Sequence, residues 1–187
     1  GQNGPNADKY LQLADDFKKN LQPDSAILYY EKASVGYQTM GNAEKFVHTY
    51  TQIGIILTRQ DNYDKAKIYL DKALSTALVS LDSNNLVLAT TYLSLGVNYA
   101  AQENYEQSLS CHYKALSIRL LKLGEYHADV ATCYGNIGNV YLRSKDVNNA
   151  LEAHLKAMKI RELLYGETGV EVIQSYTNVG NVYKEKK

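Results

Sequence analysis

Residues 134–141 read YGNIGNVY, and residues 176–183, which lie 42 positions later, read YTNVGNVY. The same block stands 42 positions earlier as YLSLGVNY at residues 92–99, and it begins once more at Tyr50 as YTQIG. A degenerate copy starts 40 residues before that, at Tyr10. Copies at this regular spacing identify an internal repeat, and the rest of the chain has to be interpreted in its register.

A second block follows the first in each unit and carries two small residues seven positions apart. These pairs are Ala26/Ala33, Ala66/Ala73, Ser108/Ala115 and Ala150/Ala157. Seven positions make two helical turns, so each pair lies on one helix face, where small side chains let two helices approach closely. The glycine inside most first blocks, which costs a helix about 1 kcal/mol relative to alanine, has the same explanation. Each unit is therefore predicted to be a helix, a tight turn and a second helix, with Asn62, Asn104 and Asp146 as N-cap residues.

The composition excludes several classes of protein. The chain has 187 residues with 20 basic and 20 acidic side chains, no net charge, and 45% apolar residues, which is ordinary for a folded domain. A neutral chain without a run of Lys or Arg lacks the electrostatic footprint of a nucleic-acid or membrane-surface binder, so neither partner is expected. No apolar stretch reaches the roughly 18–20 residues that cross a bilayer. Two isolated cysteines suit a reducing compartment.

The repeat predicts one all-α stack without an internal linker. First helices are expected near residues 7–20, 44–59, 86–101, 128–143 and 170–185, and second helices near residues 23–39, 63–81, 105–123 and 147–165. Residues 1–6 are expected to form a disordered tail. Residues 7–187 are expected to form a single array, with units near 7–46, 47–88, 89–130 and 131–172 and a partial unit at 173–187. The partial unit presents an apolar face without a second helix, so self-association through this end is expected.

The pattern resembles the tetratricopeptide repeat family. The likeness rests on three features: the Leu/Ile-Gly pair of the first block, the tyrosine three positions after the glycine, and the paired small residues of the second block. The Leu/Ile-Gly pairs are Ile53-Gly54, Leu95-Gly96 and Ile137-Gly138, and the tyrosines are Tyr99, Tyr141 and Tyr183. The period exceeds the usual period of about 34 residues and is similar to that of kinesin light chains, with Pins-type adaptors as a second likeness. The resemblance implies a right-handed α-α superhelix of about four and a half repeats.

No residue set indicates catalysis. Glycine-rich phosphate loops, nucleophile elbows and zinc-protease motifs are absent from the sequence. His112 and His154 occupy the same position in successive units, next to Cys111 in one of them. A metal site there is the less favoured interpretation, because helical histidines are more often half-buried structural residues than ligands. No metal or cofactor is therefore expected.

The resemblance implies a binding groove lined by the first helices. The positions that face it in the last two first helices hold Asn136, Asn139, Asn178 and Asn181. An Asn amide both donates and accepts hydrogen bonds, so this ladder suits the backbone of an extended peptide, although polar residues that merely cover a solvated face are the alternative. In earlier units the groove positions hold Gln52, Leu93 and Val97. The third unit, which also carries Ala100 and Ala101, is expected to form an apolar patch in the groove.

Two first helices end in arginine, at Arg59 and Arg143. A basic rim favours an acidic partner, whereas the alternative is that these charges complement the helix dipoles. The sequence thus predicts a non-catalytic adaptor that binds a peptide segment of a partner protein, with a kinesin-light-chain-like cargo or scaffold role in the cytoplasm, near the cytoskeleton. The alternative is a structural module of a larger protein that uses the repeats for oligomerisation or spacing.

Overall fold

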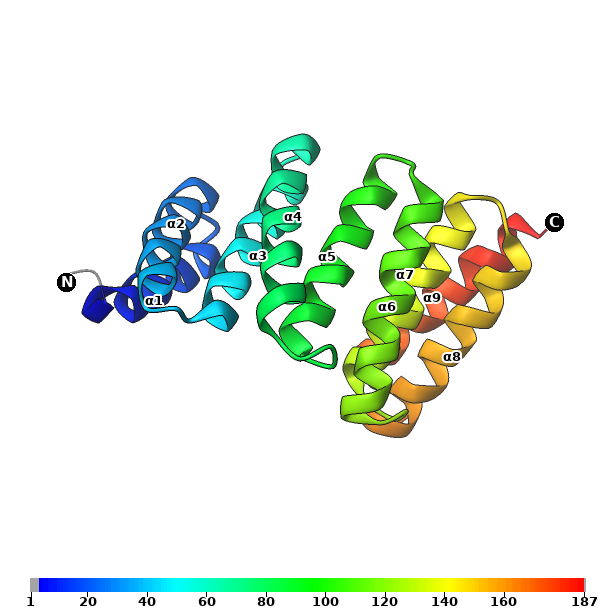
Figure 1. Ribbon diagram of the computed structural model, residues 1–187. Coiled ribbons are helices and arrows are strands. Elements are labelled where there is room, and N and C mark those ends of the chain that lie inside the picture. Colours follow the sequence, from blue (N-terminus) through cyan, green and yellow to red (C-terminus); the bar gives the residue numbers. More distant parts are fainter. Residues whose placement is uncertain (1–3, 187) are drawn as a thin grey trace.

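The computed structural model describes residues 4–186, which form helices joined by short turns (Figure 1). The first helices of the units are α1 (Gly4–Lys19), α3 (Ala43–Arg59), α5 (Leu86–Ala101), α7 (Ala128–Arg143) and α9 (Val170–Glu185). The second helices are α2 (Pro23–Thr39), α4 (Tyr63–Ser80), α6 (Tyr105–Leu123) and α8 (Val147–Tyr165). Within this part of the chain there is no strand, so the all-α prediction is confirmed.

The helices pack pairwise, and the pairs stack in chain order from one end of the molecule to the other (Figure 1). Each pair is joined by a tight turn that contains one residue in the left-handed region: Leu21, Asp61, Glu103 or Lys145, with φ between 55° and 66°. Because these residues recur 40 or 42 positions apart, the turn geometry repeats with the sequence. None of the helices described is long and apolar enough to cross a membrane.

In the second, third and fourth units, the glycine of the first block is the point at which the two helices touch. At Gly96 a Cβ atom would lie 2.5 Å from the His112 ring, and at Gly138 it would lie 2.8 Å from the His154 ring. Gly54 meets Leu70, which holds the corresponding position of its own unit. All three partner side chains are almost fully buried. The mid-helix glycines are therefore retained because no larger residue fits between the helices.

Tyrosines at the start of the repeat also have a recurring partner. The ammonium group of a lysine from the second helix lies over the ring of Tyr10, Tyr92 or Tyr134 at 5.3–5.8 Å from the ring centroid. These lysines are Lys32, Lys114 and Lys156. Tyr50 departs from the pattern, because its ring stacks on Phe46 with a centroid separation of 4.4 Å. The chain has 17 tyrosines among its 187 residues, and part of this content is explained by packing within the repeat.

The predicted helix ends agree with the structure to within one residue, apart from the first helix. The prediction of a disordered tail over residues 1–6 is wrong for residues 4–6, because α1 begins at Gly4 and so includes Pro5 and Asn6. Proline is tolerated in the first turn of a helix, where its missing N–H has no intrahelical acceptor. Residues 1–3 of the predicted tail lie outside the described residues.

The three predicted N-cap residues lie at N-cap positions, but only one of them makes a capping hydrogen bond with its side chain. Asn62, Asn104 and Asp146 all precede their helices with similar backbone angles. Only the Asp146 side chain accepts the capping hydrogen bond, from the backbone N–H of Asn149 at 3.2 Å. The side chains of Asn62 and Asn104 make no such bond.

The glycine contact makes a direct prediction about stability. Gly138→Ala pushes a Cβ against His154, so the free energy of unfolding should fall by about 1–3 kcal/mol. Gly180 holds the same position in α9 but has nothing within 4 Å of its would-be Cβ. Gly180→Ala should therefore raise the free energy of unfolding by up to about 1 kcal/mol through helix propensity alone. Urea unfolding of both variants tests this, and equal effects would show that helix approach is not the reason for the glycine.

Candidate binding groove

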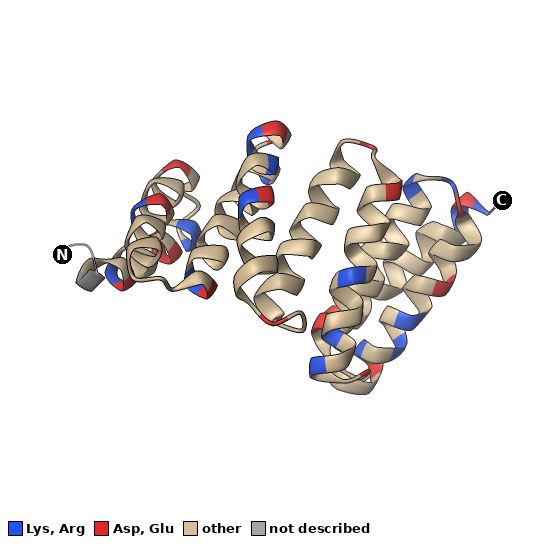
Figure 2. Cartoon of the chain, in the orientation of Figure 1, with Lys and Arg blue, Asp and Glu red and all other residues tan. Residues whose placement is uncertain are grey.

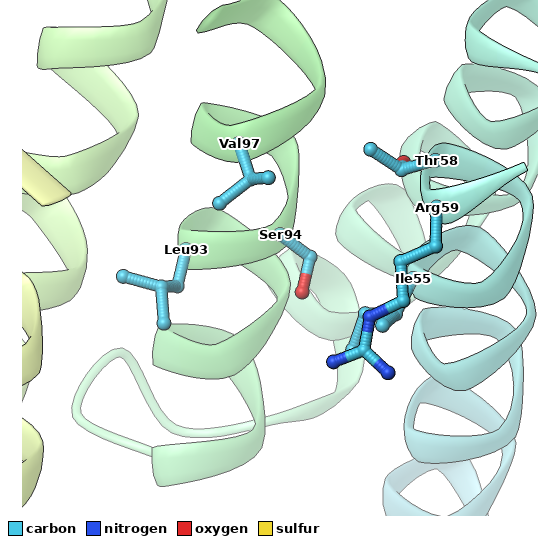
Figure 3. Close-up of a pocket in the computed structure, with 6 residues that line it drawn as sticks. All are labelled: Ile55, Thr58, Arg59, Leu93, Ser94 and Val97. Carbon is cyan, nitrogen blue, oxygen red and sulfur yellow. The ribbon is translucent and has the colours of Figure 1, made fainter. Parts of the chain in front are cut away.

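A pocket of about 200 Å³ opens between the first helices of the second and third units. It is lined by Ile55, Thr58 and Arg59 of α3 and by Leu93, Ser94 and Val97 of α5. Figure 3 shows these two groups of side chains on opposite sides of the pocket. Helix α5 carries no charged residue along its whole length, as Figure 2 shows, so the arginine supplies the only formal charge among the six lining residues.

Two buried polar contacts hold α3 and α5 together beside the pocket. The hydroxyl groups of Thr51 and Thr91 are hydrogen bonded at 2.9 Å. The fully buried Asn98 donates its amide hydrogens to Thr58 Oγ1 and to the backbone carbonyl of Tyr63, each at 3.1 Å. Because burying an unpaired amide is costly, these bonds fix the spacing of the two helices.

Sequence reasoning missed the role of Asn98. Its position in the repeat is held by Ile56, Val140 and Val182 in the second, fourth and fifth units, all of them buried apolar residues. A single amide in an otherwise apolar position is the signal that was available. It indicates a polar partner across the neighbouring unit, here the Thr58 hydroxyl.

A second pocket of about 280 Å³ shares Arg59 and adds a further cation. Lys18 lines it together with Leu21, Pro23 and Ile56. Burial lowers the pKa of Lys18, while Asp15 raises it and Arg59 lowers it. In the part of the chain that the structure describes, neither Lys18 nor Arg59 forms an ion pair. Two cations without an ion-pair partner among the described residues, beside apolar walls, make this end of the groove suitable for an anionic group.

The structure brings three of the predicted groove residues together. Arg59, Leu93 and Val97 all line the first pocket, and Val97 is 43% exposed. Gln52 is buried beside them, and its side-chain oxygen accepts a hydrogen bond from Lys18 Nζ at 2.7 Å. The Gln52 amide oxygen therefore positions the Lys18 ammonium group.

The predicted asparagines lie on the later first helices, apart from this pocket. Asn136 and Asn178 are half-buried, whereas Asn139 and Asn181 are exposed. None of the four side chains makes a hydrogen bond to another residue between positions 4 and 186. Arg143, at the end of α7, is exposed, and its guanidinium lies 5.8 Å from the centroid of the Tyr105 ring.

The histidines of the repeat are packing residues in this structure. His112 and His154 are each 1% exposed, and His112 Nδ1 and His154 Nε2 have no hydrogen-bond partner. Burial lowers the pKa of His112 to about 4 and also lowers the pKa of His154. Among the described residues, no three His, Cys, Asp or Glu side chains gather closely enough to hold a metal ion.

Comparison with known proteins agrees with this architecture. The family model for the tetratricopeptide repeat matches residues 46–120, 87–160 and 129–187. The chain therefore belongs to the tetratricopeptide repeat family, whose fold supports a role in protein–protein interaction or scaffolding. Among curated protein sequences, none matches this chain.

Several solved structures share the fold. A protein from Podosopora anserina, described as a putative kinesin light chain with nearly identical TPR-like repeats, has 13% identity and a TM-score of 0.82, covering 100% of this chain and 88% of that one. BtubC (BKLC) from P. vanneervenii has 18% identity and a TM-score of 0.73, with coverage of 100% and 85%. MamA has 21% identity and a TM-score of 0.64, with coverage of 98% and 84%. At such identities the likeness concerns the fold alone.

The buried imidazoles predict acid sensitivity. Because the pKa of His112 is depressed in the folded state, the unfolded chain binds more protons below its ordinary pKa of 6.5. Stability should therefore fall as the pH drops from about 6.5 to about 4, by up to about 3 kcal/mol for this residue.

Leucine at the same position in the second unit provides the matched variant, His112→Leu. It should be at least as stable as the parent chain at pH 7, because the unpaired nitrogen is gone. Urea unfolding at pH 7 and pH 4.5 should show its advantage growing on acidification. An advantage that is the same at both pH values would contradict the assignment.

Proposed function

We propose that the groove between α3 and α5 binds a peptide segment of a partner protein, so that the chain acts as a non-catalytic adaptor. The observation that carries this proposal is the open apolar pocket between two first helices, with an unpaired arginine at its edge. Such a pocket accepts one buried apolar side chain of a ligand, the kind of contact that dominates interface energies.

The charges beside the pocket indicate an acidic ligand. Lys18 and Arg59 line the adjoining pocket, and burial already weakens the solvation of the lysine. A carboxylate or phosphate of the ligand placed there removes the repulsion between the two cations and forms charge-assisted hydrogen bonds. The segment recognised is therefore an apolar anchor followed or preceded by an acidic group.

The groove changes in character along the stack. One position of the first helix holds Ile55, Val97, Asn139 and Asn181 in successive units. The apolar members lie at the pocket, and the exposed asparagines continue on α7 and α9. In the proposal, the anchor binds near α5 while the asparagines, with Asn136 and Asn178, pair with the peptide backbone farther along.

The particular role proposed is recruitment of a cargo or scaffold partner, as in kinesin light chains, at a cytoplasmic site associated with the cytoskeleton. It is supported by the long repeat period and by the fold shared with a protein described as a putative kinesin light chain. The second candidate function is self-association. It is favoured by the exposed apolar residues Val170, Ile173 and Tyr183 on α9.

Peptide selection from a displayed random library, followed by calorimetry, tests the groove. Val97→Asp and Arg59→Glu should each weaken the selected peptide at least tenfold, because one places a charge in the apolar pocket and the other reverses the rim charge. A triple variant that reverses the charges of Arg59 and Arg143 and carries Asn139→Ala should weaken binding of the selected peptide further.

Val79→Asp is the matched control, since Val79 is 87% exposed at the end of α4 and does not line the pocket. It should leave the affinity unchanged, and circular dichroism should show the same helicity for all variants. Unchanged affinity in the groove variants would sink the proposal. Sedimentation at increasing concentration separates the second candidate, because a strict monomer would rule out self-association.

A further inference from the structure

A third pocket with a different chemistry lies farther along the stack, among α6, α7 and α8. It measures about 110 Å³, and three of its lining residues are tyrosines: Tyr113 of α6 and Tyr134 and Tyr141 of α7. The hydroxyl groups of Tyr113 and Tyr141 are hydrogen bonded at 3.1 Å, which ties two of the rings together. None of these residues lines the groove between α3 and α5.

The pocket already holds a cation. Lys156 of α8 lines it, with Nζ 5.6 Å from the centroid of the Tyr134 ring and 2.7 Å from Glu152 Oε1. The face of a phenol ring is electronegative, so the Tyr134 ring and the Glu152 carboxylate attract positive charge, and Tyr113 and Tyr141 add further aromatic surface. Ile137 and Ala153 are also among the lining residues and give the site an apolar surface.

Repeat packing does not account for this arrangement. Tyr134, Tyr141 and Lys156 have counterparts one unit earlier in Tyr92, Tyr99 and Lys114, and Lys114 lies over Tyr92 in the same way. The remaining two groups, Tyr113 of α6 and Glu152 of α8, are not repeated at the corresponding positions one unit earlier. Tyr113 corresponds to Asp71, and Glu152 corresponds to Ser110. The third ring and Glu152 therefore add to a structural lysine–tyrosine contact and make it an open pocket that can receive a cation.

We propose that this pocket binds the trimethylammonium head of a methylated lysine from a partner protein, with Lys156 as an internal cation that moves aside. A volume of about 110 Å³ suits a compact head of this kind. A trimethylated ammonium is weakly hydrated and has no N–H to satisfy, so aromatic rings and an apolar floor are adequate partners. The Lys156–Glu152 pair is exposed on one helix, so separating it costs little.

The rim argues for a protein ligand over a choline lipid, which carries the same head group. Asn149 lines the pocket, and its side chain donates to Asp146 Oδ2 at 2.7 Å. Asp146 and Glu152 therefore place negative charge close to the opening. The phosphate of a phosphocholine would meet these carboxylates, whereas the backbone of a lysine-bearing peptide is neutral there.

The test uses the whole chain and a glycine-flanked trimethyllysine tripeptide, titrated by NMR against the unmodified lysine tripeptide. The methylated peptide should bind at least fivefold more tightly. Tyr113→Leu and Glu152→Gln should remove most of this preference, whereas Tyr126→Leu, a variant of an exposed tyrosine outside the pocket, should not.

Lys156→Met should tighten binding because it removes the internal competitor, and Lys114→Met, its counterpart one unit earlier, should not. Equal binding of the two peptides, or no gain in Lys156→Met, would overturn the proposal. Preferential binding to phosphatidylcholine vesicles would assign the pocket to lipid and would also overturn it. Because no groove residue is altered, failure here leaves the proposal for the α3–α5 groove untouched.

Discussion

The close approach of the two helices within a unit is the contact on which the rest of the solenoid depends. A glycine on the first helix receives a buried side chain of the second, Leu70 in one unit and a histidine in the next two. Because a Cβ at Gly96 or Gly138 would collide with that side chain, the distance between the helices is set by the backbone itself. These rigid helix pairs stack on one another, so the position of each groove residue depends on the packing of its own pair.

Contacts between units then decide where a ligand can bind. Helices α3 and α5 are held together by buried hydroxyl and amide groups, through the Thr51–Thr91 contact and through Asn98. The rest of their facing surface consists of apolar side chains, two hydroxyl-bearing residues and one arginine, and these residues line the pocket. A purely apolar junction would bind the helices equally well but would specify their relative position less strictly, since hydrogen bonds depend on direction.

The sequence was sufficient for most of the fold, because register, turn residues and small-residue spacing all repeat. The start of α1 was missed, since residues 1–6 were expected to form a tail, whereas Pro5 suits a first helical turn. Arg59, Leu93 and Val97 were placed by register alone. The pocket that joins them was not predictable, because it depends on how two units pack against each other.

Departures from the repeat are more informative about function than the repeat itself. A residue that recurs every 42 positions, such as Gly138 or Lys156, is explained by the packing that all units share. Packing of the common unit does not require Tyr113 or Glu152, because the preceding unit folds with other residue types in those positions. In a solenoid each unit contacts mainly its neighbours, so one unit can acquire a new surface without disturbing the others. Two separate surfaces with different ligand chemistry are therefore compatible with one short array.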